Sequence, residues 1–245
     1  MRAPSQGGMD QLLDQQRICS NSRTLPYRTP IGNRHNTLRA VLHLEIASKL
    51  RTPSRHHPPM LYAQVHLTLP AWIHDAVDPQ AVYASDTDKV ALAVELSRLN
   101  LEAGSGGPFG AAVFGPDHRI ISVGVNRVVP QTTSLAHAEN MAYMLAQQRL
   151  QSPRLNAVLS PVTLATSSQP CCQCYGATIW AGIDRLLIGA SAEDVMALTT
   201  FDEGPLPADW VGELERRGIE VVRNLHRDAA CAVLRRYGEL DSPRY

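Results

Sequence analysis

The pattern of apolar and polar positions divides the chain at about residue 75. From Asp78 onward, short apolar runs alternate with segments in which apolar side chains recur every three or four positions. The first pattern is typical of strands and the second of amphipathic helices. Before residue 75, only Leu38–Leu50 shows helical spacing, in a stretch rich in Arg, Ser, Pro, Gln and His. We therefore expect a poorly ordered N-terminal extension over 1–75 and one packed domain over 76–245.

The packed domain is predicted to be an α/β domain with layered helices and strands. Ser85 followed by Asp88 resembles a capping box at the start of the first helix, and Gly104 would end that helix. A Gly-Pro-Asp turn predicts that the first two strands form a hairpin. The predicted helices cover 85–103, 136–150, 171–181, 192–198, 209–217 and 227–237, and the predicted strands cover 111–114, 120–125, 161–166, 185–188 and 219–222.

Cysteine usage and hydropathy indicate the cellular setting. The chain has five cysteines, and three of them fall within 171–174, which suits a metal site better than a disulfide framework. Reduced thiols imply a reducing compartment, so we expect a cytoplasmic protein. No apolar run approaches the roughly 18–20 residues that span a membrane. The first thirty residues also lack the compact apolar stretch of a signal peptide.

Two short motifs carry candidate metal chemistry: His-Ala-Glu at 137–139 and Pro-Cys-Cys-Gln-Cys at 170–174. One nitrogen and two sulfurs, from His137, Cys171 and Cys174, could bind Zn²⁺. Three protein ligands leave the fourth tetrahedral position open, which is the arrangement of a catalytic zinc site. We therefore expect one Zn²⁺ per subunit.

Both motifs fall in the first turns of predicted helices. Cys171 and Cys174 are three positions apart and share a helix face, whereas Cys172 cannot easily join them and is interpreted as a packing residue beside the metal. The positive ends of two helix dipoles would help to keep the cysteines as thiolates. Glu139 is not needed as a ligand and could move protons to and from a water that the metal activates. Two alternatives without catalysis are a structural zinc site and cysteines packed as small apolar residues.

The motif pair is the signature of zinc nucleobase deaminases. Residues from about 86 to 237 resemble the cytidine deaminase superfamily, and within it bacterial guanine deaminases and the related tRNA adenosine deaminases. The resemblance is carried by Gly-Gly-Pro-Phe-Gly-Ala at 106–111, Asn126 eleven residues before His137, Ala-His-Ala-Glu at 136–139, Thr-Ser at 166–167, Gly-Ala at 176–177, Ile-Trp-Ala at 179–181 and Phe-Asp-Glu at 201–203.

This resemblance implies a three-layer α/β/α fold with a five-stranded mixed sheet. It also implies that 76–245 is a zinc-dependent deaminase domain, a hydrolase that acts on C–N bonds of cyclic amidines. The expected reaction is hydrolytic deamination of a free purine-type base, guanine or an analogue, with release of ammonia. Family members of this type are dimers, so we expect a homodimer, in which Tyr245 could close the partner's site.

The resemblance further implies a substrate pocket formed by Phe109, Asn126, Ala138, Trp180 and Glu203. Asn126 would hydrogen-bond the base, and the backbone N–H of Ala138 would face its carbonyl side. Phe109 and Trp180 would wall the pocket. Glu203 would contact the purine and assist proton transfer, at a position where the family usually has aspartate.

Departures from the family pattern keep the substrate open. Gln169 stands where the family usually has glutamate, and Asn140 stands where it usually has an aliphatic residue. Both positions lie near the metal ligands. A modified purine, a triazine, a pteridine-like ring, cytosine and nucleosides therefore stay as alternatives, as does a catalytically silent binding module.

Charge separates free bases from nucleic acids as substrates. Residues 1–65 hold nine Lys and Arg against three Asp and Glu, whereas residues 66–245 hold fourteen against twenty. An enzyme that acts on nucleic acid needs a basic surface to neutralise phosphates. We therefore expect a small base or nucleoside as the substrate rather than nucleic acid. The basic N-terminal segment is the best argument for a tRNA adenosine deaminase instead.

Overall fold

The computed structural model of the chain describes residues 64–240. The chain divides into two units, Met1–Leu61 and Tyr62–Tyr245. Most of the expected extension, and Tyr245 with its expected role at a partner's site, lie outside the described residues. Within the second unit, Ile73 is buried in the apolar core, and Trp72 Nε1 donates a hydrogen bond to Ser105 Oγ at 3.0 Å. The boundary expected at 75 therefore falls inside a packed segment.

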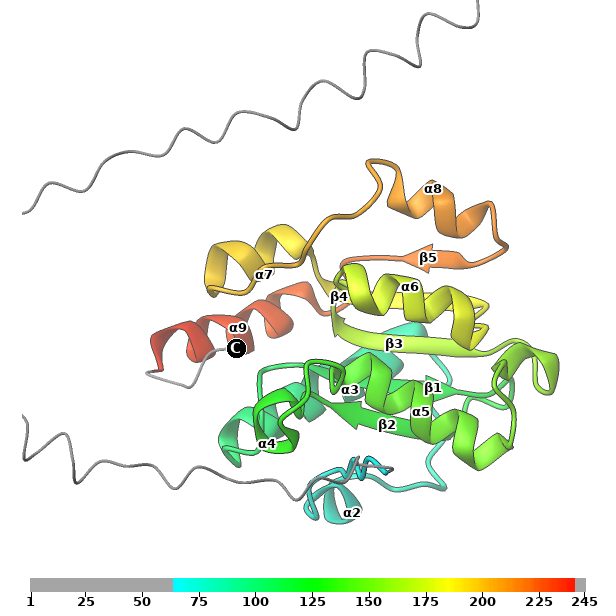
Figure 1. Cartoon of the computed structure of the whole chain (residues 1–245), viewed down its shortest axis with the longest axis horizontal. Helices are drawn as coiled ribbons and strands as arrows, with labels where there is room; N and C mark the ends of the chain where they lie inside the picture. Colours follow the sequence, from blue (N-terminus) through cyan, green and yellow to red (C-terminus); the bar gives the residue numbers. More distant parts are fainter. Residues whose placement is uncertain (1–63, 241–245) are drawn as a thin grey trace, which may run out of the picture. The chain divides into compact units, whose positions relative to one another are not determined.

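Five strands form one mixed sheet, as predicted (Figure 1). The order is β2-β1-β3-β4-β5; β1 is antiparallel to β2 and β3, while β3, β4 and β5 run parallel. The predicted hairpin is β1–β2. The third strand lies two residues later than predicted, because Ser167 and Ser168 are polar but buried in the sheet. The strands are β1 (Gly110–Phe114), β2 (Ile120–Val125), β3 (Thr163–Ser168), β4 (Arg185–Ala190) and β5 (Glu220–Val222).

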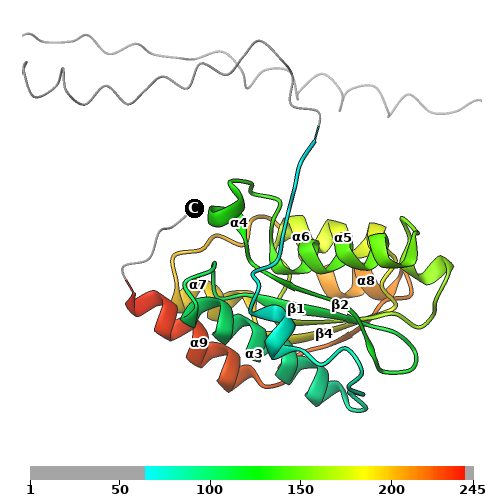
Figure 2. The same cartoon turned by 90° about the horizontal axis from the view of Figure 1, so that it is seen from below.

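Helices cover both faces of the sheet, which confirms the predicted three-layer fold (Figure 2). α3 and α9 pack on one face and α5 and α6 on the other, each pair over its own apolar cluster. The short elements α2, α4 and η1 were not predicted, because three or four residues are too few to show a period. The helices are α2 (Ile73–Ala76), α3 (Asp86–Glu102), α4 (Val128–Gln131), α5 (Ala138–Leu150), the 3₁₀ helix η1 (Leu155–Ala157), α6 (Cys172–Ala181), α7 (Ala192–Leu198), α8 (Trp210–Glu215) and α9 (Arg227–Glu239).

The first three strands are buried on both faces, and the start of α5 packs closely on β2. Every residue of β1, β2 and β3 is buried. The start of α5 lies directly against β2 at Gly124, where a Cβ atom would be 2.0 Å from the carbonyl oxygen of Ala138. Only glycine allows this approach.

Across residues 64–240, no helix is long and apolar enough to cross a membrane.

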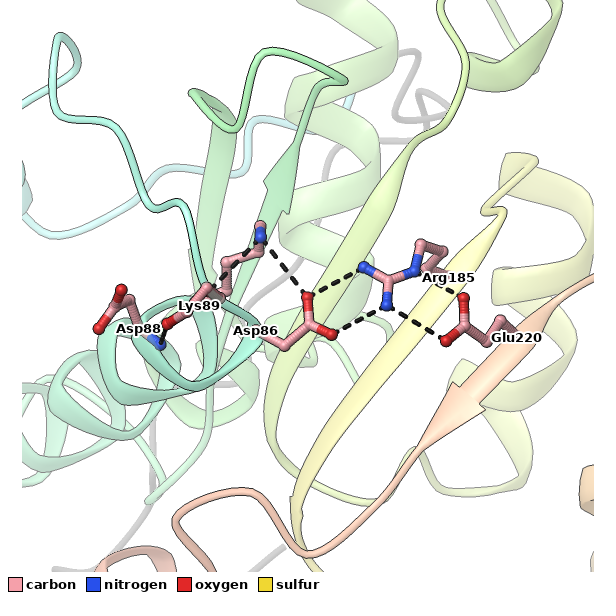
Figure 3. A network of polar contacts seen from close by, with 6 residues as sticks. Asp86, Asp88, Lys89, Arg185 and Glu220 are labelled. Atoms are coloured by element: carbon pink, nitrogen blue, oxygen red, sulfur yellow. Dashed lines mark hydrogen bonds and ion pairs between the residues drawn. The ribbon is translucent and has the colours of Figure 1, made fainter.

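A network of charged side chains ties the start of α3 to the first residues of β4 and β5 (Figure 3). Nη1 and Nη2 of Arg185 donate to Asp86, at 2.9 and 2.8 Å, and Nε of Arg185 donates to Glu220 at 2.7 Å. Lys89 is 1% exposed and lies 3.6 Å from Asp86. Hydrogen bonds from Arg185 hold the pKa of Asp86 below its usual value. Asp86 therefore forms ion pairs with two cations, Arg185 and the buried Lys89.

We predict that Asp86→Asn destabilises the domain more than Glu220→Gln. The first substitution leaves the buried Lys89 without its carboxylate and should cost about 2 kcal/mol of unfolding free energy. The second removes a mostly exposed carboxylate and should cost less than about 1 kcal/mol. Urea unfolding of the metal-loaded protein measures both.

The same comparison has an expected pH dependence. The pKa of Asp86 is lower in the folded than in the unfolded chain, so its stabilisation is present above the unfolded pKa and is lost as the pH falls through the folded pKa. The difference in unfolding free energy between the wild type and Asp86→Asn should therefore become smaller below about pH 4. Equal losses for the two variants, or a gap that widens in acid, would contradict this account.

Candidate active site

Two helix starts bring the predicted metal ligands together. His137 is the N-cap residue of α5, Cys171 is the N-cap residue of α6, and Cys174 lies in the first turn of α6. His137 Nδ1 is 3.4 Å from Cys171 Sγ and 3.6 Å from Cys174 Sγ. Neither N-cap side chain makes a capping hydrogen bond. Both are therefore directed to the metal position rather than to their own helices.

This donor set fits a tetrahedral zinc ion. Zinc–nitrogen and zinc–sulfur bonds of ordinary length at a tetrahedral angle place the nitrogen and sulfur about 3.6 Å apart, close to both distances here. All three donor atoms lie within 4.8 Å of one another, and the group that the described residues form contains no fourth ligand. The arrangement matches an open, catalytic zinc site rather than a closed structural one.

The electrostatics of the site favour a thiolate at Cys171. Hydrogen bonding by Cys174, with a further contribution from His137, lowers the pKa of Cys171 to about 4. Cys171 also stands at a helix N-terminus, where the helix dipole favours negative charge. The pKa of Cys174 is raised, first of all by its hydrogen bond to Cys171. Cys174 therefore keeps its proton while Cys171 is a thiolate. A divalent cation would take the place of that proton.

Glu139 lies beside the metal ligands in the first turn of α5. Its side chain is 6% exposed. Burial, reinforced by the negative charge of Cys171, raises the pKa of Glu139 to about 7. A group that takes up and releases protons works best when its pKa is near the operating pH. A bound cation would favour the carboxylate and move this value down.

Glu203 reaches the same pocket from the loop after α7. Cys172 N–H donates to the backbone oxygen of Glu203 at 2.9 Å, so the loop is fastened to the start of α6. Gly204 follows with φ +67°, and a Cβ there would be 2.5 Å from Cys172 Sγ. Cys172 Sγ thus lies against Gly204, although Cys172 is exposed. Burial, followed by the charges of Cys171 and Glu139, raises the pKa of Glu203 to about 8.

The remaining walls are aromatic and polar. Phe109 contacts Phe201 with ring centroids 5.2 Å apart, and Phe201 stacks on Tyr237 at 5.2 Å. Asn126 is 1% exposed; its Oδ1 accepts from Val128 N–H at 3.3 Å. The resulting pocket has a volume of about 300 Å³, the lower end of the range for small-molecule sites. Its lining residues are Phe109, Asn126, Ser134, His137, Ala138, Glu139, Gln169, Cys171, Cys172, Gln173, Phe201, Asp202, Glu203 and Gly204.

One expected pocket residue lies elsewhere. Trp180 is 77% exposed and lines a separate shallow pocket on the outer side of α5 and α6. It follows Cys174 by six positions, which turns it about 120° around the helix and moves it about 9 Å along the axis. The prediction that Trp180 walls the metal pocket of its own chain is therefore wrong. Phe109, Asn126, Ala138 and Glu203 all line the pocket.

Sequence reasoning missed several lining residues. Gln173 lies on the same helix turn as the cysteines, and its Nε2 donates to the Ser134 carbonyl oxygen at 3.1 Å, which joins the two motif loops. Asp202 and Gly204 flank Glu203. The Asp-Glu-Gly sequence is a turn signal that could have located the loop, but not its position against α6.

Several known proteins are similar to this chain. The family described as the cytidine and deoxycytidylate deaminase zinc-binding region matches residues 84–190. A probable cytosine deaminase of Schizosaccharomyces pombe is 33% identical over 128 residues, which are 50% of this chain and 74% of the relative. The solved structure of a guanine deaminase from Nitrosomonas europaea is 43% identical, with a TM-score of 0.69, and the match covers 74% of this chain and 100% of that one.

A further solved structure holds a purine analogue. It is in complex with 8-azaguanine, is 44% identical to this chain and has a TM-score of 0.69, and the match covers 73% of this chain and 99% of that one. Residues 84–190, which match the family, include His137, Cys171 and Cys174. The chain belongs to the cytidine and deoxycytidylate deaminase family.

Proposed function

We propose that this protein catalyses the hydrolytic deamination of a free purine-type base, guanine or a close analogue, with release of ammonia. Glu139 and Glu203 share a small pocket with an open His-Cys-Cys zinc site, and this juxtaposition carries the proposal. Similarity to the guanine deaminase and to the structure with 8-azaguanine supports the choice of ring.

The chemistry follows from where the carboxylates lie. A zinc ion held by His137, Cys171 and Cys174 would act as a Lewis acid and make a water nucleophilic at neutral pH. Glu139 takes one proton from that water and delivers it to a ring nitrogen, while the water oxygen bonds to the amine-bearing carbon. Glu139 then passes the second proton to the amine; the C–N bond breaks, ammonia leaves, and a carbonyl oxygen replaces the amine. Glu203 assists by hydrogen-bonding the ring and the departing group.

The charge of the pocket favours a free base over a nucleic acid. Among the described residues that line it, none is Lys or Arg, whereas Glu139, Asp202 and Glu203 are acidic. A substrate that carries phosphates would meet these carboxylates without a lysine or arginine to neutralise its charge. A neutral ring with an exocyclic amine meets no such penalty.

Ammonia release tests the proposal directly. The zinc-loaded protein is assayed with guanine, adenine, cytosine, their nucleosides, and aminated triazine and pteridine rings. We expect the highest kcat/KM on guanine or a guanine analogue. Turnover of cytosine or of a nucleoside ahead of every purine base would overturn the substrate class, and release from none would support a silent binding module.

We predict that Glu139→Gln keeps the fold and the metal but loses turnover. Glutamine has the same shape but cannot carry a proton, so kcat should fall by about 100- to 10,000-fold. Glu193→Gln is the matched control, because Glu193 is an exposed glutamate in the first turn of another helix, α7. A Glu139→Gln enzyme within a few-fold of the wild-type rate would show that another group moves the proton.

We predict one zinc ion per chain, and a domain that is less stable without it. The metal would join the starts of α5 and α6, so its binding free energy adds to the folding free energy. Elemental analysis measures the number of zinc ions per chain, and calorimetry with and without a chelator measures the melting temperature. His137→Ala should abolish binding, whereas His118→Ala, in a hairpin turn, should not. Full zinc content in His137→Ala would contradict the ligand assignment.

We further propose that the protein is a cytoplasmic homodimer. Free thiols at Cys171, Cys172 and Cys174 support a reducing compartment. Trp180 and Leu135, 77% and 58% exposed, lie on one uncharged patch over α5 and α6, and such apolar patches mark interaction sites. Light scattering should give a dimer for the wild type and a smaller species for Trp180→Glu. A wild-type monomer, or a variant that dimerises equally well, would refute this interface.

A further inference from the structure

Gln169 is a buried polar residue whose role the proton-transfer chemistry does not explain. It connects the end of β3 to Pro170 and the zinc-binding cysteines. Its backbone N–H donates to the Ala190 carbonyl oxygen at 2.8 Å, which continues the pairing of β3 with β4 and fixes the position of the residue. The residue is 7% exposed, and what remains exposed lies in the lining of the active-site pocket.

One hydrogen bond sets the orientation of the Gln169 side-chain amide. Its Oε1 accepts from the backbone N–H of Ala192, the first residue of α7, at 3.4 Å. An N–H group can be met only by the oxygen of the amide and not by its NH₂ group. The amide nitrogen Nε2 is therefore directed away from α7.

That nitrogen is available to a ligand. Among residues 64–240, Nε2 of Gln169 has no hydrogen-bond partner, and the single fully buried side-chain polar atom without a partner is Ser168 Oγ. Nε2 must therefore reach open space, and the space next to Gln169 is the pocket. A base that fills the pocket removes water from Nε2, and an amide donor buried without a partner is costly, so the site favours a ligand whose acceptor atom pairs with Nε2.

Gln173 differs from Gln169 because its side-chain amide nitrogen already has a hydrogen-bond partner. It is the other glutamine that lines the pocket, but its Nε2 is already used by the Ser134 carbonyl oxygen. Glu139 and Glu203, when ionised, present only acceptors. Gln169 thus offers the pocket a neutral donor whose direction is set by its contact with α7.

We propose that Gln169 is a specificity-determining residue that donates a hydrogen bond from Nε2 to an acceptor atom, a carbonyl oxygen or a ring nitrogen, of the bound base. This inference rests on the proposed function. A glutamate, usual at this position in the family, could still accept from Ala192 N–H but would have no proton to give. Gln169 therefore selects rings with an acceptor at that point and leaves the reaction itself unchanged.

The test uses rings that each lack one acceptor. Guanine is compared with 2-aminopurine, which lacks the carbonyl oxygen, and with 7-deazaguanine and 3-deazaguanine, which lack one ring nitrogen each. Gln169→Met removes the donor, and Gln169→Glu removes it while keeping the acceptor for Ala192. Gln173→Met is the matched control. Ammonia release gives kcat and KM, and calorimetry with 8-azaguanine gives binding without turnover.

We expect Gln169→Met and Gln169→Glu to weaken 8-azaguanine binding and to lower kcat/KM on guanine by about five- to tenfold, mainly through KM. The analogue that lacks the acceptor for Gln169 should have a kcat/KM that is already lower than that of guanine by a similar factor in the wild type. Neither Gln169 variant should lower its kcat/KM further. Any loss in Gln173→Met should be the same for all four rings. A uniform loss over the rings in the Gln169 variants, or no loss, would overturn the inference. No ammonia from any of the four purine-type rings with the wild type would instead refute the proposed function.

Discussion

The structure depends on a single geometric requirement: one nitrogen and two sulfurs must meet at a tetrahedral metal. His137 and Cys171 are 34 positions apart, yet their donor atoms lie 3.4 Å apart. The mixed sheet makes this possible because α5 follows β2 and α6 follows β3 on the same face (Figure 2). Both helices begin at the metal position, and the close approach at Gly124 fixes the start of α5. The site is thus built on the rigid ends of two buried elements.

The same convergence concentrates negative charge. Two cysteine sulfurs and the carboxylates of Glu139 and Glu203 occupy one small pocket, and each raises the cost of ionising the others. The pKa values of the two glutamates are raised first of all by burial, and the charge of Cys171 raises them further. Helix N-termini offset part of this cost, but a divalent cation offsets far more. The chemistry of the pocket and its need for a metal therefore have one physical origin.

Local patterns in the sequence identified the three side chains that the structure brings together, His137, Cys171 and Cys174, because placement at helix starts depends mainly on short-range geometry. The apolar pattern also predicted the five strands, and the family resemblance predicted the three layers. Trp180 was misplaced because a motif match does not show how far a residue has turned around its helix. The orientation of the Gln169 amide could not be predicted from the sequence, because it depends on a contact with Ala192, which is 23 positions away. Tertiary contacts of this kind leave no trace in spacing.

Cobalt substitution tests the open His-Cys-Cys centre most directly. Co²⁺ replaces Zn²⁺ in tetrahedral sites and reports its ligands in the visible and near-ultraviolet spectrum. We predict intense tetrahedral bands with thiolate-to-cobalt charge transfer, loss of that charge transfer when Cys171 and Cys174 are replaced by serine, and a band shift when 8-azaguanine enters beside the open position. A weak octahedral spectrum without thiolate bands, or a tetrahedral spectrum that no purine perturbs, would contradict a catalytic metal centre at the two helix starts.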